Sequence, residues 1–205
     1  MSDHVEVTGS GAASAVPDVV VLDTRVQAEA PDVATALAQA ASRVAAALQA
    51  AADHGIADRD RRTRGMGVNP RWDREGQRVV GYTAHHAVRL VVRDRDRVGD
   101  VIGAMAGAAG DAFGLDAVTL EVADPAPLLV RAREAAFEDA RSRAEQYASL
   151  ADRPLGPVLR VTEGGGFEPP TPRFAKAAMD VGGGMPVEAG ESTVTATVTV
   201  RFGLA

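Results

Sequence analysis

Histidine is the side chain best suited to moving a proton or holding a metal ion near neutral pH, and this chain has four: His4, His54, His85 and His86. His85 and His86 are adjacent in a segment that alternates like a strand, so they point to opposite faces and could not bind one ion together. The sequence contains no cysteine and no His-x-x-x-His or Glu-x-x-His pair. Because a metal site needs several such ligands, the sequence predicts no metal site and no catalytic histidine.

Two glycine-containing segments invite comparison with catalytic motifs. Gly9-Ser10-Gly11 lacks the flanking pattern of a nucleophile elbow, and we interpret it as a turn between two strands. Gly164-Gly165-Gly166 leads into Pro169-Pro170, where the helix that follows a phosphate-binding loop could not begin. We therefore expect no cofactor.

The charged residues argue against a nucleic-acid partner. The chain carries 22 basic and 28 acidic residues, for a net charge of -6, whereas nucleic-acid binding needs a basic surface. The arginine-rich segments 58–64 and 93–97 are interleaved with aspartate, which favours local ion pairs on a solvated surface. No run approaches the ~18 apolar residues of a membrane-spanning helix, so we also expect no transmembrane segment.

A binding or catalytic pocket could also be formed by residues that belong to no recognisable motif. Tyr82, His86 and Arg89 lie in the longest predicted strand, residues 78–92. Sheets of the predicted type carry many functions. A small-molecule-binding protein or an enzyme with a pocket on this sheet is therefore the alternative hypothesis.

Residues 164–191 have the composition of a long, mobile Gly/Pro-rich loop. Within it, a proline-rich segment with polyproline tendency is flanked by phenylalanines and ends near an arginine, which suits docking onto a protein partner. A plain linker is the competing interpretation. The candidate interaction residues are Phe167, Pro169, Pro170, Arg173, Phe174 and Met179.

The periodicity of apolar residues predicts the order β-β-α-β-β-α-β-α-β-β. Residues from about 19 to 122 form a ferredoxin-like βαββαβ unit, so the fold class is α+β. An N-terminal strand, a long third helix and two further strands extend this unit, either within the same sheet or as a second lobe. We interpret residues 1–205 as a single domain.

Two of these outer elements have especially regular patterns. The helix at about 126–151 has a predicted core stripe of Leu129, Ala132, Ala136, Ala140, Ala144 and Tyr147. In residues 192–202, valine, alanine and phenylalanine alternate with threonine and arginine. The threonines of this strand carry no charge and no proline interrupts it, so we expect it to be central in a sheet or covered by another subunit.

Several motifs, in order along about 190 residues, resemble those of the SIMPL-domain family. They are Gly9-Ser10-Gly11, Val16-Pro17-Asp18, Gly81-Tyr82-Thr83-Ala84, the AAFEDARSRA of residues 135–144, Leu155-Gly156-Pro157-Val158 with Glu163, and the MPVEAGE of residues 185–191 before the last strand. The resemblance implies no catalytic residue, because the family has no established catalytic motif. Bacterial relatives often carry an export signal or a lipoprotein leader. Here MSDHVEV has no such leader, so we expect a cytoplasmic protein, or a periplasmic or surface protein if a leader was removed.

These observations favour a non-enzymatic function. The predicted fold offers several sheet edges and a partner-like loop but no catalytic constellation. We therefore expect a SIMPL-domain protein that acts as a self-assembling or protein-interaction module. A homo-oligomer is predicted, with a further protein partner binding through the proline-rich loop.

Overall fold

The computed structural model describes residues 3–164, 171–172 and 190–205. Contacts between residues divide the chain into two compact units. The central unit comprises Asp18–Glu121, and the terminal unit comprises Met1–Pro17 together with Val122–Ala205. Each unit has its own sheet and its own core.

The central unit has the predicted ferredoxin-like topology. Its elements are β2 (Val19–Ala30), α1 (Val33–Asp53), β3 (Arg61–Trp72), β4 (Val79–Val92), α2 (Val98–Ala109) and β5 (Phe113–Glu121), with single 3-10 turns at Asp58–Asp60, Arg95–Arg97 and Gly110–Ala112. The strand order is β3-β4-β2-β5, and every neighbouring pair is antiparallel. The prediction of a βαββαβ unit from about residue 19 to residue 122 is confirmed.

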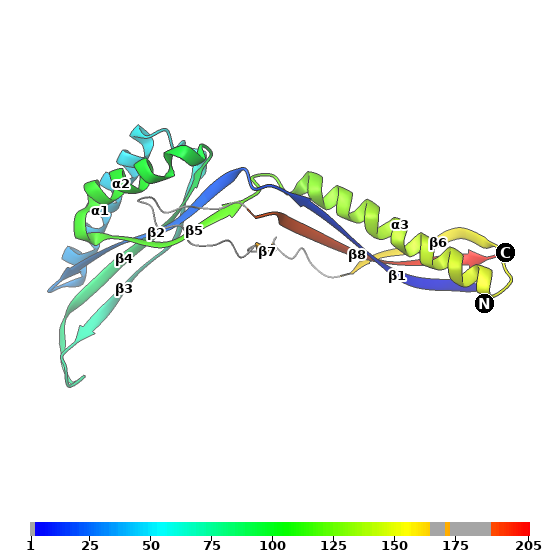
Figure 1. The fold of residues 1–205 in the computed structure, drawn as a ribbon. Helices are drawn as coiled ribbons and strands as arrows, with labels where there is room; N and C mark the ends of the chain where they lie inside the picture. The colour runs from blue at the N-terminus through cyan, green and yellow to red at the C-terminus, as the bar shows by residue number, and fades with distance from the viewer. Residues whose placement is uncertain (1–2, 165–170, 173–189) are drawn as a thin grey trace, which may run out of the picture. The chain divides into compact units, whose positions relative to one another are not determined.

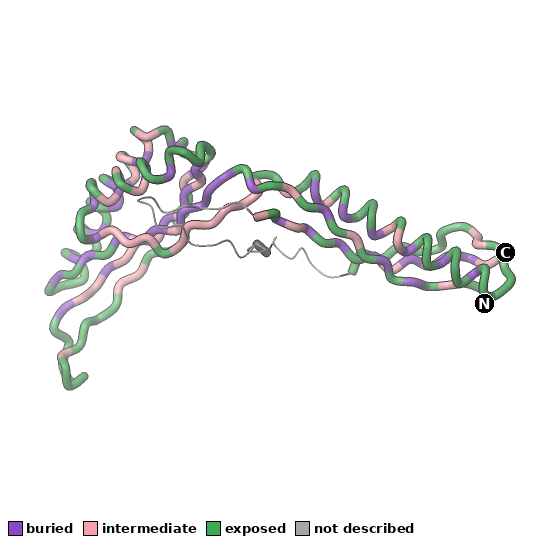
Figure 2. Tube along the Cα trace, viewed as in Figure 1, coloured by how far each residue is buried: buried purple, intermediate pink, exposed green. Residues whose placement is uncertain are grey.

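The core of the central unit follows from alternation along its two inner strands. Val20, Leu22 and Val26 of β2 are buried, and so are Val88 and Leu90 of β4. Because alternate strand residues share a face, these side chains form one apolar surface. The helices α1 and α2 cover this face (Figures 1 and 2), and the Asp32 carboxylate caps α1 by accepting the Thr35 N–H at 2.9 Å.

The terminal unit is built from both ends of the chain. Its elements are β1 (His4–Ala15), α3 (Ala126–Leu150), β6 (Leu155–Gly164), the two-residue β7 (Thr171–Pro172) and β8 (Ser192–Leu204). The strand order is β1-β8-β6, with β7 also paired to β8. Of the two arrangements that the sequence left open, the structure therefore has a second sheet. Of the two possibilities expected for the last strand, central in a sheet or covered by another subunit, the structure shows the first.

The interpretation of Gly9-Ser10-Gly11 as a turn is wrong, because the segment lies inside β1. The two glycines allow α3 to approach the strand closely. A Cβ atom on Gly9 would lie 2.2 Å from the Ala136 carbonyl oxygen, and one on Gly11 would lie 2.2 Å from that of Ala132. The absence of a side chain here is a packing requirement rather than a turn signal.

The buried stripe of α3 also differs at its ends from the prediction. The buried residues follow a four-residue spacing: Leu128, Ala132, Ala136, Ala140, Ala144 and Ala148. Leu129 is only partly buried, and the Tyr147 side chain is 56% exposed. Close approach to β1 selects small side chains, and the alanine stripe supplies them.

No helix in the described part of the chain is long and apolar enough to cross a membrane.

Candidate protein-interaction site

The two edges of the terminal sheet differ, and the β1 edge is closed by side chains of α3. The Ser10 N–H donates to Asp139 Oδ2 at 2.8 Å, and Arg143 Nη1 donates to the Thr8 carbonyl at 3.1 Å. Arg143 also pairs with Asp139 at 2.9 Å. One helix thus satisfies both a donor and an acceptor of the strand, which removes them as a template for another strand.

The charge state of Asp139 fits this role. The hydrogen bond from the Ser10 amide lowers the pKa of the Asp139 carboxyl below its usual value, partial desolvation opposes the shift, and Arg143 lowers the pKa further. The carboxylate is therefore ionised at neutral pH. An ionised carboxylate is the stronger acceptor for a backbone N–H.

The opposite edge, formed by β6, is open. Within the described residues β6 pairs only with β8, and α3 packs mainly against β1 and β8. The residues Val158, Leu159 and Val161 are 44%, 49% and 52% exposed. An unpaired strand with exposed apolar side chains is a surface that another chain can extend.

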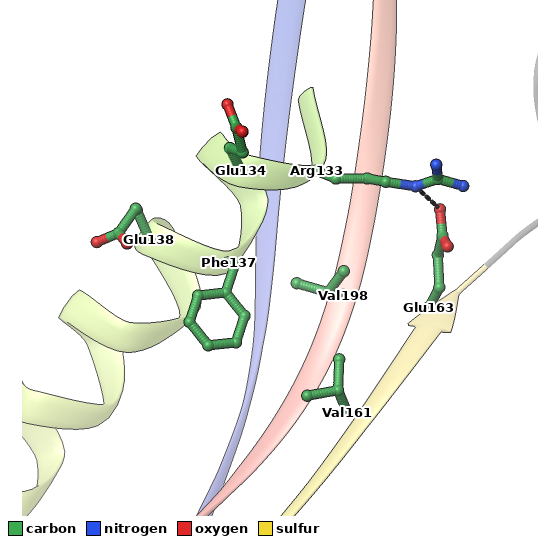
Figure 3. A pocket seen from close by; sticks show the side chains of 7 residues that line it. All are labelled: Arg133, Glu134, Phe137, Glu138, Val161, Glu163 and Val198. Atoms are coloured by element: carbon green, nitrogen blue, oxygen red, sulfur yellow. Dashed lines mark hydrogen bonds and ion pairs between the residues drawn. The ribbon is translucent and has the colours of Figure 1, made fainter. Parts of the chain in front are cut away.

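A hollow of about 420 Å³ lies beside this edge. Phe137 of α3, Val198 of β8 and Val161 of β6 line it, and at one end Arg133 Nε donates to Glu163 Oε1 at 2.8 Å (Figure 3). Glu134 and Glu138 complete the lining. Phe137, Val161 and Val198 give the hollow an apolar wall, so it is suited to receiving an apolar side chain.

A row of charges crosses the sheet and ends at this edge. Glu6 of β1 lies opposite Arg201 of β8, which lies opposite Arg160 of β6. Arg201 donates to Glu6 at 2.9 Å. Arg160 forms no ion pair within the described residues, and its strand neighbour carries the same charge. Like charges directly opposite each other are unfavourable, so the open side of Arg160 favours an acidic side chain.

The residues of the pocket hypothesis do not lie on one face of the central sheet. Tyr82 and His86 are on the helix-covered face, opposite Ala30 and Val26 of β2. The His86 ring lies 3.2 Å from the Thr63 hydroxyl, and burial lowers the pKa of this histidine. Arg89 belongs to the opposite phase of β4, and its Nε and Nη2 donate to Asp23 at 2.9 and 2.8 Å.

Arg89 and Asp23 form a two-pronged ion pair between neighbouring strands of the sheet. The hydrogen bond with Arg89 lowers the pKa of Asp23, desolvation opposes it, and the charges of Arg89 and Arg64 add to the lowering. Both groups are thus held ionised. Within the described residues, no group of three or more His, Cys, Asp or Glu could hold a metal ion.

The predicted interaction residues of the proline-rich segment, Phe167, Pro169, Pro170, Arg173, Phe174 and Met179, lie outside the described residues. The prediction of a mobile loop over residues 164–191 falls largely outside them too. Inside this segment, Thr171 and Pro172 pair with Thr193 and Ser192 of β8. The interaction and mobility of the remainder stay predictions.

Sequence reasoning missed the residues that distinguish the two edges. Asp139 stands in the sequence only as a member of the AAFEDARSRA segment, although its spacing from Ala136, Ala140 and Arg143 places it beside the stripe that packs on β1. Arg160 and Val161 belong to one of the two further predicted strands, and Glu163 belongs to a motif that resembles the SIMPL family, but the sequence predicted no role for them. Local alternation could have marked them, but only the strand order shows that they are at an edge.

A comparison with protein-family models shows to which family this chain belongs. The sequence model of SIMPL, described as a protein of unknown function (DUF541), matches residues 5–202. The chain belongs to the SIMPL family. The match covers both compact units, and the resemblance inferred from the motifs is confirmed.

Two curated proteins are similar in sequence to this SIMPL protein. It is 31% identical to the uncharacterized protein YggE of Escherichia coli K12 over 161 residues, which are 77% of this chain and 64% of YggE. It is 26% identical to the 26 kDa periplasmic immunogenic protein of Brucella melitensis, over 97% of this chain and 84% of that protein. A solved structure of AtUAH in complex with (S)-hydroxyglycine aligns with a TM-score of 0.29 and 12% identity over 55% of this chain and 30% of that one; a likeness this low supports no argument.

Proposed function

We propose that this SIMPL protein is a non-enzymatic protein-interaction module whose binding element is the open edge of β6. The observation that carries the proposal is the difference between the two edges of one sheet. Asp139 and Arg143 close the β1 edge, whereas within the described residues β6 pairs only with β8 and exposes Val158, Leu159 and Val161. Partner strands bind such edges through backbone hydrogen bonds, and neighbouring pockets select their side chains.

The hollow between α3 and β6 supports a recognition role. A strand added to β6 would place alternate side chains on the α3 side of the sheet, where Phe137, Val161 and Val198 line the hollow. Burial of an apolar side chain there contributes roughly 25 cal/mol per Å² removed from water. The hollow can thus select an apolar residue at a defined position of a bound strand.

The alternative hypothesis of a pocket on the ferredoxin-like sheet gains no support from the positions of its residues. Tyr82 and His86 lie on one face, and Arg89, already paired with Asp23, lies on the other. A single ligand on one face could not contact all three. The homo-oligomer stays a prediction.

For the location, the name of the Brucella relative, a periplasmic protein, supports the second of our two expectations, a periplasmic or surface protein. Detection of this SIMPL protein in the periplasmic or the cytoplasmic fraction of its native host decides between them.

Site-specific photo-crosslinking in the native host tests the interaction module. A photoreactive amino acid replaces Val161, and the control places it at Thr195, which is exposed on the face of the same sheet away from α3. We expect a discrete adduct from position 161 and none from position 195. The captured chain, once purified, should bind wild-type protein and not the Val161→Lys variant. Equal adducts at both positions, or unchanged binding by Val161→Lys, would contradict the proposal.

A further inference from the structure

We infer that the β6 edge pairs, in antiparallel orientation, with the β5 edge of a second copy of this chain. The inference rests on the proposed function and names the partner of the same edge. It follows from a comparison of the four outer strands of the two sheets, β1, β6, β3 and β5, and from the side chains that each edge presents.

Two of the four edges are unsuited to pairing with β6. The β1 edge is occupied by Asp139 and Arg143 of α3. The β3 edge has a register shift between Thr63 and Gly65 and contains Pro70, which has no N–H to donate. Arg62 of β3 would also bring a positive charge towards Arg160. Of the edges other than β6 itself, β5 remains.

The regular parts of β6 and β5 have complementary residues in antiparallel order. On β6 the sequence is Arg160-Val161-Thr162, and on β5 it is Thr119-Leu120-Glu121. Antiparallel pairing places each charged, apolar and hydroxyl side chain beside its complement: Arg160 with Glu121, Val161 with Leu120, and Thr162 with Thr119.

The faces of the two strands match in this register. Val161 is paired with Val200, which is buried under α3. Leu120 is paired with Val20 and packs against the core beneath α1 and α2. Arg160 and Glu121 lie on the other faces of their sheets. Pairing therefore places apolar beside apolar on the helix side and opposite charges together on the other side.

Glu121 is available for this contact. Its side chain is 45% exposed, and within the described residues its carboxylate has an ion pair of 3.9 Å with Arg89 and a hydrogen bond of 3.4 Å from the Thr119 hydroxyl. In the assembled sheet, the row Glu6, Arg201, Arg160 would end on Glu121 of the second copy. The acid offsets the unfavourable adjacency of the two arginines.

This contact joins two different surfaces, so it is heterologous. Each copy offers one β6 edge and one β5 edge, and successive copies associate head to tail. Such contacts form a closed ring when the rotation between copies closes, and an open chain when it does not. The inference excludes a symmetric dimer through two β6 edges, because Arg160 would then have no Glu121 opposite it.

The test uses charge reversal in the full chain, with size measured by light scattering over a concentration series. The variants are Arg160→Glu, Glu121→Arg and the double variant with both. Exposed charges away from both edges provide the matched control, Arg43→Glu with Glu75→Arg. Thermal unfolding followed by circular dichroism checks that each variant is folded, and Glu121→Gln separates loss of the charge from its reversal.

We expect each single reversal to raise the midpoint concentration of association by at least about five-fold, while the control leaves it unchanged. The double variant, and an equimolar mixture of the two single variants, should recover wild-type association. If Val161→Lys dissolves the assembly but Glu121→Arg does not, β6 is the binding edge and the inferred partner strand is wrong. A wild-type chain that stays monomeric throughout the series overturns the inference, and the crosslinking test then decides the proposed function separately.

Discussion

At the scale of single residues, the terminal unit depends on how closely a helix can approach a strand. Gly9 and Gly11 face the alanine stripe of α3, and any added Cβ would meet helix backbone at 2.2 Å. Because Asp139 and Arg143 reach the edge of β1 only when α3 lies this close, the same glycines also determine whether the edge is closed.

Gly9→Ala should therefore destabilise the protein by about 1–3 kcal/mol or more, the usual cost of overpacking. The matched control is Gly65→Ala in β3, where an added Cβ meets nothing within 4 Å. Chemical denaturation of the two variants measures the difference in the free energy of unfolding. A Gly9→Ala protein as stable as Gly65→Ala would show that the packing of α3 on β1 is looser than described.

Asp139 gives a pH dependence whose sign is fixed by its lowered pKa. Its folded-state pKa lies below the unfolded value, mainly because of the Ser10 amide. The stabilisation is therefore present above the unfolded pKa of about 3.9 and is lost as the pH falls through the folded pKa. The difference in unfolding free energy between wild type and Asp139→Ala should be constant from neutral pH to mildly acidic pH and then shrink. A difference that grows on acidification would contradict this role.

The sequence allowed the role of a residue to be predicted only where that role depends on nearby residues. Metal-ligand and nucleophile motifs are of this kind, because they are defined by residue types at short spacings. The glycines of β1 were misinterpreted because a turn and a close helix contact both select glycine. The contact partners, Ala132 and Ala136, are more than a hundred residues away in the chain.

At the scale of elements, periodicity identified the helices and strands but not which strands pair. The βαββαβ unit could be predicted because each of its elements has a clear period and its topology is common. The β1–β8 pairing joins His4 to Gly203, and no local pattern specifies a contact so distant. The order β1-β8-β6 therefore came only from the structure, and with it the distinction between a closed and an open edge.

The central position of β8 makes it indispensable to the terminal unit. Val194, Val200 and Phe202 are buried under α3, and each contributes about 1.5–3 kcal/mol when fully buried. Deletion of residues 192–205 should thus abolish the protection of α3 and β1 against amide hydrogen exchange. Protection should persist in β2 and β4, which serve as the internal control. Retained protection in α3 would mean that β8 is replaceable.

At the scale of the whole molecule, the central unit is continuous in sequence while the terminal unit contains both ends. The central unit has its own core, and its two ends are linked by a hydrogen bond of 3.1 Å from the Asp18 N–H to the Glu121 carbonyl. Units with their own core and neighbouring ends tolerate excision. The isolated fragment of residues 18–121 should unfold cooperatively with heat, as followed by circular dichroism. A fragment without a cooperative transition would show that its fold depends on the terminal unit.

The proposed binding role of β6 could not be predicted from the sequence. Val158, Leu159 and Val161 resemble any short strand until the neighbouring elements are known. Their exposure follows because β8 takes one side of β6 and α3 lies over β1 and β8. Composition alone predicted that the proline-rich segment docks onto a partner. Of this segment, the described structure includes Thr171 and Pro172, which pair with β8.

Amide hydrogen exchange along β6, measured at low and high protein concentration, tests most directly whether this edge binds another chain. If a second copy pairs with β6, the outward-facing amides within residues 160–164 should exchange more slowly at high concentration. The Ser10 amide, already bonded to Asp139, should not change, and Val161→Lys should remove the concentration dependence. Exchange in β6 that is identical at both concentrations, in a protein that light scattering shows to be assembled, would place the interface elsewhere and contradict the β6 edge as the binding surface.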